Sequence, residues 1–127
     1  MRKTVLVIED DPGIQETLEM ALDMEGYEPI IARDGIEALS QLDHTKPVLI
    51  LLDLMMPRMN GYEFIEALRQ RDMFPGIPII IVTADGRARY KAEQAGAEGY
   101  IIKPFELSTL LDEIKRLAQD DFYSPAG

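Results

Sequence analysis

Five short segments rich in Val, Ile and Leu recur along this chain, and they limit its fold more than any other feature. They are Thr4 to Ile8, Tyr27 to Ile31, Val48 to Leu52, Pro78 to Val82 and Gly99 to Ile102. Apolar residues follow one another in these segments instead of alternating with polar ones, which is typical of strands buried on both faces. The pattern therefore predicts a parallel sheet with helices on both sides.

The segments between these runs have the period of amphipathic helices. The last is the clearest, because its apolar residues form one stripe from Leu107 to Ala118. Strand and helix thus alternate five times, which predicts a doubly wound α/β domain with its ligand site at the carboxyl ends of the strands. The other helices are expected from Pro12 to before Gly26, from Asp34-Gly35 to near His44, after Asn60-Gly61, and between Asp85 and Ala95.

Length and charge exclude several classes of protein. A chain of 127 residues has room for one compact domain with one sizeable core. Its net charge of −10 would repel a phosphate backbone, so we expect no direct binding of nucleic acid. The absence of cysteine excludes thiol catalysis, cysteine-ligated zinc and disulfides.

The N-terminal apolar run does not predict export. It stops at Glu9, which is too early for a secretory signal. No window approaches the roughly 18 apolar residues that a membrane span requires. We therefore expect a cytoplasmic protein with no membrane partner.

Polar residues gather where the predicted strands end. Glu9 and Asp10 follow the first strand, and Asp53 follows the third. Neighbouring parallel strands would bring these acids within about 5 to 7 Å, where each pair repels by about 2 to 3 kcal/mol at an effective dielectric constant near 20. Few carboxylates with room for water suit Mg²⁺, which is the predicted cofactor. Asp11, by contrast, is expected to cap the first helix because Pro12 follows it.

The remaining strand ends carry groups that suit phosphoryl transfer. Asp53 stands alone after the central strand and is the candidate nucleophile. Lys103 would neutralise charge on the transferred group, and the Thr83 hydroxyl would donate to a phosphoryl oxygen beside the small Ala84.

From Lys3 to Gln119 the chain resembles the receiver domain of two-component response regulators, also called CheY-like domains. The resemblance implies a flavodoxin-like sheet with strand order 2-1-3-4-5, a receiver domain over residues 1–120 and a flexible tail or linker start at 121–127. Four motifs carry it in order: Val5 to Pro12, Leu51 to Gly61, Val82 to Ala84, and Ala95 to Phe105.

This resemblance implies that Asp53 accepts a phosphoryl group from a phosphohistidine of a sensor kinase or phosphotransfer protein. Asp10, Asp53 and the backbone carbonyl of Met55 would hold Mg²⁺, for which Mn²⁺ could substitute, and Glu9 would act through water. The domain would catalyse its own phosphorylation and dephosphorylation, as a signalling switch rather than a classical enzyme.

The resemblance also implies a switch. Thr83 would move toward the phosphoryl group and Tyr100 would turn inward, remodelling the face made by the fourth helix, fifth strand and fifth helix. That face would control a downstream protein or output domain, and a phosphorylation-dependent homodimer is a further option. The Lys103-Pro104 bond is expected to be cis.

Two other readings of the sequence remain open. One is a binding module of similar fold that signals by constitutive contacts without phosphorylation. The other is a flavin or nucleotide carrier, which would need a loop rich in glycine or hydroxyls where this chain has Glu9, Asp10 and Asp11. The single histidine, His44, is expected at the surface, so the phosphoryl donor must be another molecule.

Overall fold

Five parallel strands form one sheet in the computed structural model, which describes residues 2–56, 58–71 and 76–118. Their spatial order is β2-β1-β3-β4-β5, as the resemblance implied. The predicted tail at 121–127, Gln119 and Pro57 of the second motif lie outside the described residues. The strands are β1 (Thr4–Ile8), β2 (Glu28–Ala32), β3 (Leu49–Asp53), β4 (Ile79–Thr83) and β5 (Gly99–Ile102).

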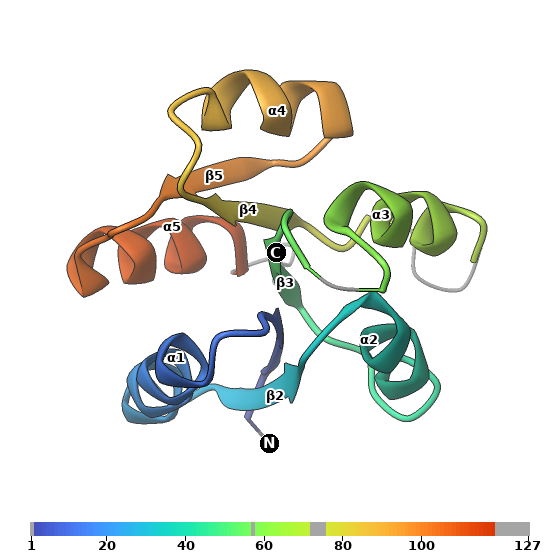
Figure 1. Ribbon diagram of the computed structural model, residues 1–127. Helices are drawn as coiled ribbons and strands as arrows, with labels where there is room; N and C mark the ends of the chain where they lie inside the picture. Colours follow the sequence, from blue (N-terminus) through green and yellow to red (C-terminus); the bar gives the residue numbers. More distant parts are fainter. Residues whose placement is uncertain (1, 57, 72–75, 119–127) are drawn as a thin grey trace, which may run out of the picture.

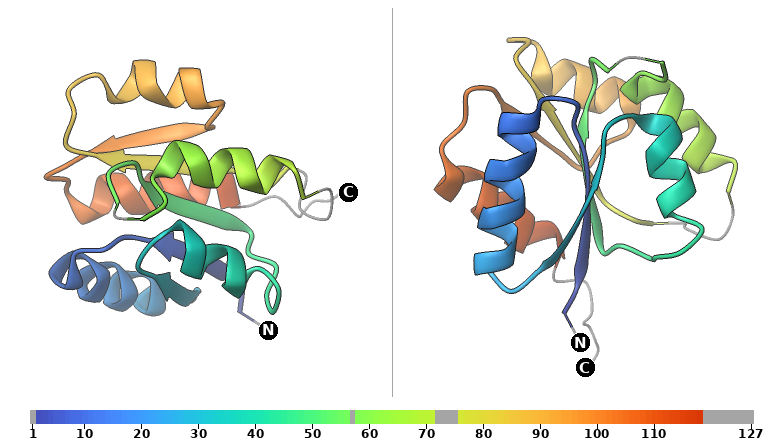
Figure 2. Two further views of the ribbon diagram at one scale, coloured as in Figure 1. Left: turned by 45° about the vertical axis from the view of Figure 1, so that its right-hand side comes forward. Right: turned by 60° about the horizontal axis from the view of Figure 1, so that its bottom comes forward.

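Helices cover both faces of the sheet, and Figure 1 shows α1 and α5 on one side with α2 and α3 on the other. Figure 2 shows the same layers from two further directions. Since successive strand residues point to opposite faces, each face builds its own core. The helices are α1 (Pro12–Met24), α2 (Gly35–Gln41), α3 (Gly61–Arg69), α4 (Ala88–Ala95) and α5 (Leu107–Ala118).

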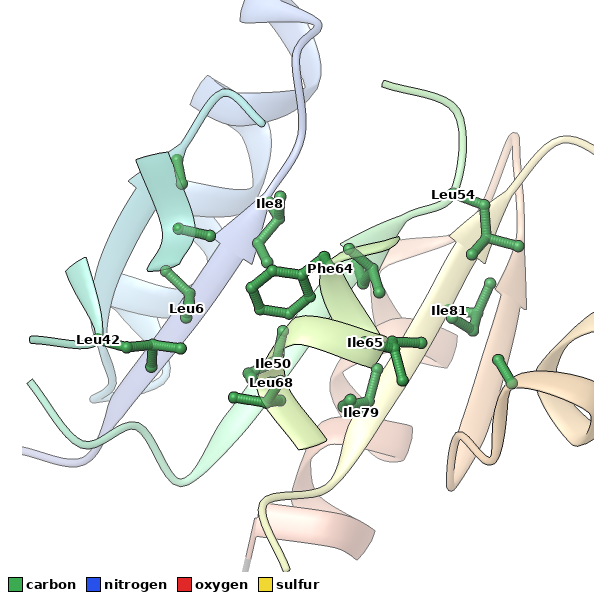
Figure 3. Close-up of a cluster of buried hydrophobic side chains, with 14 of the residues drawn as sticks. Leu6, Ile8, Leu42, Ile50, Leu54, Phe64, Ile65, Leu68, Ile79 and Ile81 are labelled. Atoms are coloured by element: carbon green, nitrogen blue, oxygen red, sulfur yellow. The ribbon is translucent and has the colours of Figure 1, made fainter. Parts of the chain in front are cut away.

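The core under α2, α3 and α4 is built around Phe64 of α3. In the cluster drawn in Figure 3, this fully buried ring packs with strand residues that include Ile8 of β1 and Ile50 of β3. The core on the other face joins Val7 and Leu51 to Leu110 and other residues of α1 and α5. Both cores hold the central strands rigidly, and so fix the strand ends where the polar residues gather.

The central strands are buried on both faces as predicted, but the prediction is wrong for the edge strands. On β5 the buried Ile101 faces α5, whereas Tyr100 and Ile102 are exposed. An edge strand has a neighbour on one side only, and α4 leaves these two side chains uncovered. Only β1, β3 and β4 are buried throughout or nearly so.

Three strands begin and end one residue later than the sequence predicts. Tyr27 still donates its N–H to Leu22 at the end of α1, and Pro78 has no N–H to donate. The second helix ends at Gln41 rather than near His44, because the N–H groups of Asp43 and His44 donate to carbonyls three residues back in a tight turn. His44 is exposed, as expected.

Acidic and amide side chains cap three helices at their N-termini. Asp11 accepts from the N–H of Gly13 at 2.8 Å and of Ile14 at 3.1 Å, which confirms its predicted role. Asn60 forms a reciprocal capping box with Glu63 at the start of α3. Asp34 accepts from the N–H of Glu37 at 2.9 Å at the start of α2.

Asp34 should contribute folding stability that is lost at acid pH. Burial alone would raise its pKa, but the N–H of Glu37 and the guanidinium of Arg58 outweigh burial and lower the pKa below its usual range. A carboxyl with a depressed folded pKa adds stability above its unfolded pKa and loses it as the pH falls through the folded one. Because Arg58 is half exposed and screened by water, we expect Asp34→Asn to cost about 1 kcal/mol at pH 7.

Urea unfolding at pH 7 and pH 3 tests this expectation. Asparagine keeps the cap, so the difference between the two proteins should shrink markedly at pH 3. A difference of the same size at both pH values would contradict it.

Candidate functional site

The polar residues predicted to converge do lie together at the carboxyl edge of the sheet. Glu9 and Asp10 follow β1, Asp53 ends β3, and Lys103 follows β5. One carboxylate oxygen from each of Glu9, Asp10 and Asp53 lies within 4.8 Å of the others, slightly closer than expected. The ammonium group of Lys103 reaches between two of these acids, Glu9 and Asp53.

Lys103 is the cation of this cluster. Its Nζ lies 2.9 Å from Oε1 of Glu9 and 3.3 Å from Oδ2 of Asp53. Burial alone would lower the pKa of Lys103, but the hydrogen bond to Glu9 and the charges of Asp53 and Glu9 outweigh it and raise the pKa. Lys103 therefore stays protonated at neutral pH.

The three acids differ in their surroundings. Glu9 is buried and accepts from the N–H of Asp11 at 3.1 Å, whereas Asp10 is exposed. Burial raises the pKa of Glu9, and the hydrogen bond from Lys103 offsets only part of the rise. Asp53 is buried, and its Oδ1 accepts from the N–H of Met55 at 3.0 Å.

This donor set fits a divalent cation. Three carboxylates and one ammonium leave an excess of negative charge, and the oxygens are the hard ligands that Mg²⁺ prefers. Asp10 opens the cluster to solvent, so an ion there could keep several of its waters. The residues that could hold it are those the sequence singles out.

Thr83 and Tyr100 lie on neighbouring strands but in different environments. Thr83 is buried at the end of β4, where its Oγ1 accepts from the N–H of Asp85 at 3.3 Å. Tyr100 is 38% exposed on β5, where it pairs in register with Ile81, two residues before Thr83. Tyr100 is therefore not a core side chain in this structure. The Lys103-Pro104 bond is cis, as the resemblance implied.

Two hollows flank the acid cluster. An apolar one, whose lining includes Ile14, Ala84 and Phe105, reaches Lys103 from the side of α1. The other is lined by Asp10, Arg33, Asp34 and Arg58, and sequence reasoning missed its arginines because they lie 25 residues apart in two different loops. No local pattern in the sequence predicts that these two arginines lie together.

Comparisons with known proteins agree with this geometry. A family model described as "Response regulator receiver domain" matches residues 5–115. The phosphate regulon transcriptional regulatory protein PhoB of Escherichia coli (strain K12) is 38% identical over 117 residues, which cover 91% of this chain and 51% of PhoB. The chain thus spans about half the length of the curated relatives it matches.

Solved structures show the same fold. The chemotaxis response regulator CheY4 of Vibrio cholerae superposes with a TM-score of 0.85 at 32% identity, covering 92% of this chain and 99% of CheY4. The receiver domain of a sensor histidine kinase from Pseudomonas aeruginosa PAO1 has a TM-score of 0.85 at 29% identity, covering 94% of this chain and all of that one. That structure holds a magnesium ion coordinated in its active site cleft.

Among residues 2–56, 58–71 and 76–118, no helix combines the length and the apolar character needed to cross a bilayer.

Proposed function

The chain belongs to the receiver domain family of two-component response regulators, and from this premise we propose that Asp53 accepts a phosphoryl group from a phosphohistidine. The donor would be a sensor kinase or a phosphotransfer protein in the cytoplasm. The observation that carries the proposal is the setting of Asp53. It is a buried carboxylate in contact with Lys103, at a cluster with Glu9 and Asp10.

Asp10, Asp53 and the backbone carbonyl of Met55 would hold Mg²⁺, or Mn²⁺ in its place, with Glu9 acting through water. When bound, the ion supplies positive charge that offsets both the acids and the oxygens of the incoming phosphoryl group. Lys103 already contacts one oxygen of Glu9 and one of Asp53, whereas Asp10 is exposed to solvent.

The chain's own residues account for the transfer. A carboxylate oxygen of Asp53 attacks phosphorus, the new P–O bond forms, and the P–N bond breaks with its electron pair left on the donor imidazole. Lys103 can exchange its bond to Asp53 for one to a phosphoryl oxygen while it keeps Glu9. The Thr83 hydroxyl would donate to another phosphoryl oxygen.

The signal would leave the site through β4 and β5. Movement of Thr83 toward the phosphoryl group would vacate space that the exposed Tyr100 could enter. The surface formed by α4, β5 and α5 would then change and control a downstream protein, an output domain or a second copy of the chain. We assign the receiver domain to residues 1–120.

Phosphoryl uptake tests the proposal directly. The purified chain is incubated with acetyl phosphate and either Mg²⁺ or EDTA, and its intact mass is measured. We expect a gain of one phosphoryl group with Mg²⁺ and none with EDTA. No gain in either case would reject the proposal and favour a module that signals by constitutive contacts.

A further inference from the structure

Two contacts hold the loop between β3 and α3 against the start of α2: an ion pair between side chains and a packing contact. Nε of Arg58 donates to Oδ2 of Asp34 at 2.7 Å, and a second guanidinium nitrogen of Arg58 contacts the same oxygen. Beside this ion pair, Met59 packs so tightly on Gly35 that a Cβ there would lie 2.7 Å from its Sδ. We call the two contacts, Arg58 with Asp34 and Met59 with Gly35, the loop clamp.

The backbone at Arg58 indicates that the clamp sets the position of the loop. Arg58 has a φ of 64°, in the left-handed region that is unfavourable for residues with a Cβ. Its ion pair with Asp34 compensates for that cost. The two ends of the loop are also joined, since the N–H of Gly61 donates to the carbonyl of Leu54 at 3.1 Å. These contacts hold Leu54, Arg58 and Gly61, on the two sides of the loop, in place.

This loop borders the acid cluster. It starts directly after Asp53 and carries Met55, whose N–H donates to Oδ1 of Asp53. Asp10, Arg33, Asp34 and Arg58 line one open hollow, so the clamp lies next to the exposed acid of the cluster. By charge alone, a guanidinium in this place would oppose the binding of a cation. The position of Arg58 therefore needs another reason.

We propose that Arg58 is a positioning residue for the divalent ion: its ion pair with Asp34 holds the β3–α3 loop where Met55 can reach the site. This inference rests on the proposed function, since Met55 is a ligand only in that assignment. It makes a prediction opposite in sign to simple electrostatics. Loss of Arg58 should weaken Mg²⁺ binding, although it removes a positive charge.

Calorimetric titration of the full chain with Mg²⁺ separates the two effects. We expect Arg58→Ala to raise the dissociation constant about tenfold, in the range usual for groups that support metal ligands. Arg58→Lys should recover part of the loss, because an ammonium can still pair with Asp34. Arg33→Ala is the matched control. Arg33 lines the same hollow, but its side chain is 71% exposed and pairs only loosely with Glu37. Its removal should leave the affinity for Mg²⁺ unchanged or slightly higher.

A kinetic measurement excludes a general loss of structure. Arg58→Ala should be phosphorylated by acetyl phosphate at the same rate as the parent when Mg²⁺ is saturating. Its rate should fall below that of the parent only when Mg²⁺ is limiting. Equal or tighter Mg²⁺ binding by Arg58→Ala, or a lower rate at saturating Mg²⁺, would overturn the inference while the proposed function stood. If the parent chain itself bound no Mg²⁺, the proposed function would fail instead.

Discussion

The Asp53→Asn protein is expected to gain no phosphoryl group from acetyl phosphate and Mg²⁺, where the parent gains one. An amide oxygen is a poor nucleophile, and neither Glu9 nor Asp10 should take over, since both follow β1 and only Asp53 ends the central strand β3. Intact mass measures the gain, and fragmentation of the modified parent should locate it on the peptide containing Asp53. Asp112→Asn, which changes an exposed acid of α5, is the matched control and should react normally.

Asp53→Asn should also stabilise the metal-free protein against unfolding. At an effective dielectric constant near 20, charges about 4.8 Å apart repel by roughly 3.5 kcal/mol, and the 3.3 Å contact of Asp53 with Lys103 attracts by about 5 kcal/mol. Two repulsions outweigh one attraction, so urea unfolding in EDTA should show Asp53→Asn more stable by about 1 kcal/mol after relaxation and screening. A less stable variant would mean that the acids are not crowded enough to need an ion.

Much of the fold could be predicted because periodicity is a local signal. The runs at Val5 and Leu49 are apolar on successive residues, and the structure buries both faces of those strands. The exposure of Tyr100 could not be predicted in the same way. It depends on β5 being the last strand in the spatial order, which its own residues do not reveal.

The acid cluster was predictable for a topological reason. Parallel strands end at one edge of the sheet, so Glu9 and Asp53 had to meet once their strands were recognised as neighbours. The pair between Arg58 and Asp34 had no such signal. It joins two loops 24 residues apart, and it depends on a left-handed backbone at a residue that is not glycine.

Mg²⁺ is expected to raise the melting temperature of the parent chain by a large amount. The folded cluster binds the ion and the unfolded chain does not, so a concentration one hundred times the dissociation constant adds about 2.7 kcal/mol of stability. For a domain of this size that corresponds to a rise of roughly 10 °C. Thermal unfolding followed by circular dichroism, in EDTA and in Mg²⁺ at matched ionic strength, measures the rise.

Asp10→Ala should erase most of this response without harming the fold, because Asp10 is exposed and lies outside any helix or strand. In EDTA the variant should melt at a higher temperature than the parent. Removing one of the three crowded charges lowers the repulsion among the acids, as the bound ion does in the parent. Asp112→Ala is the control and should respond to Mg²⁺ like the parent. An equal rise in Asp10→Ala and the parent would mean that Mg²⁺ acts elsewhere on the acidic surface, and the assignment of the ion to this cluster would then be wrong.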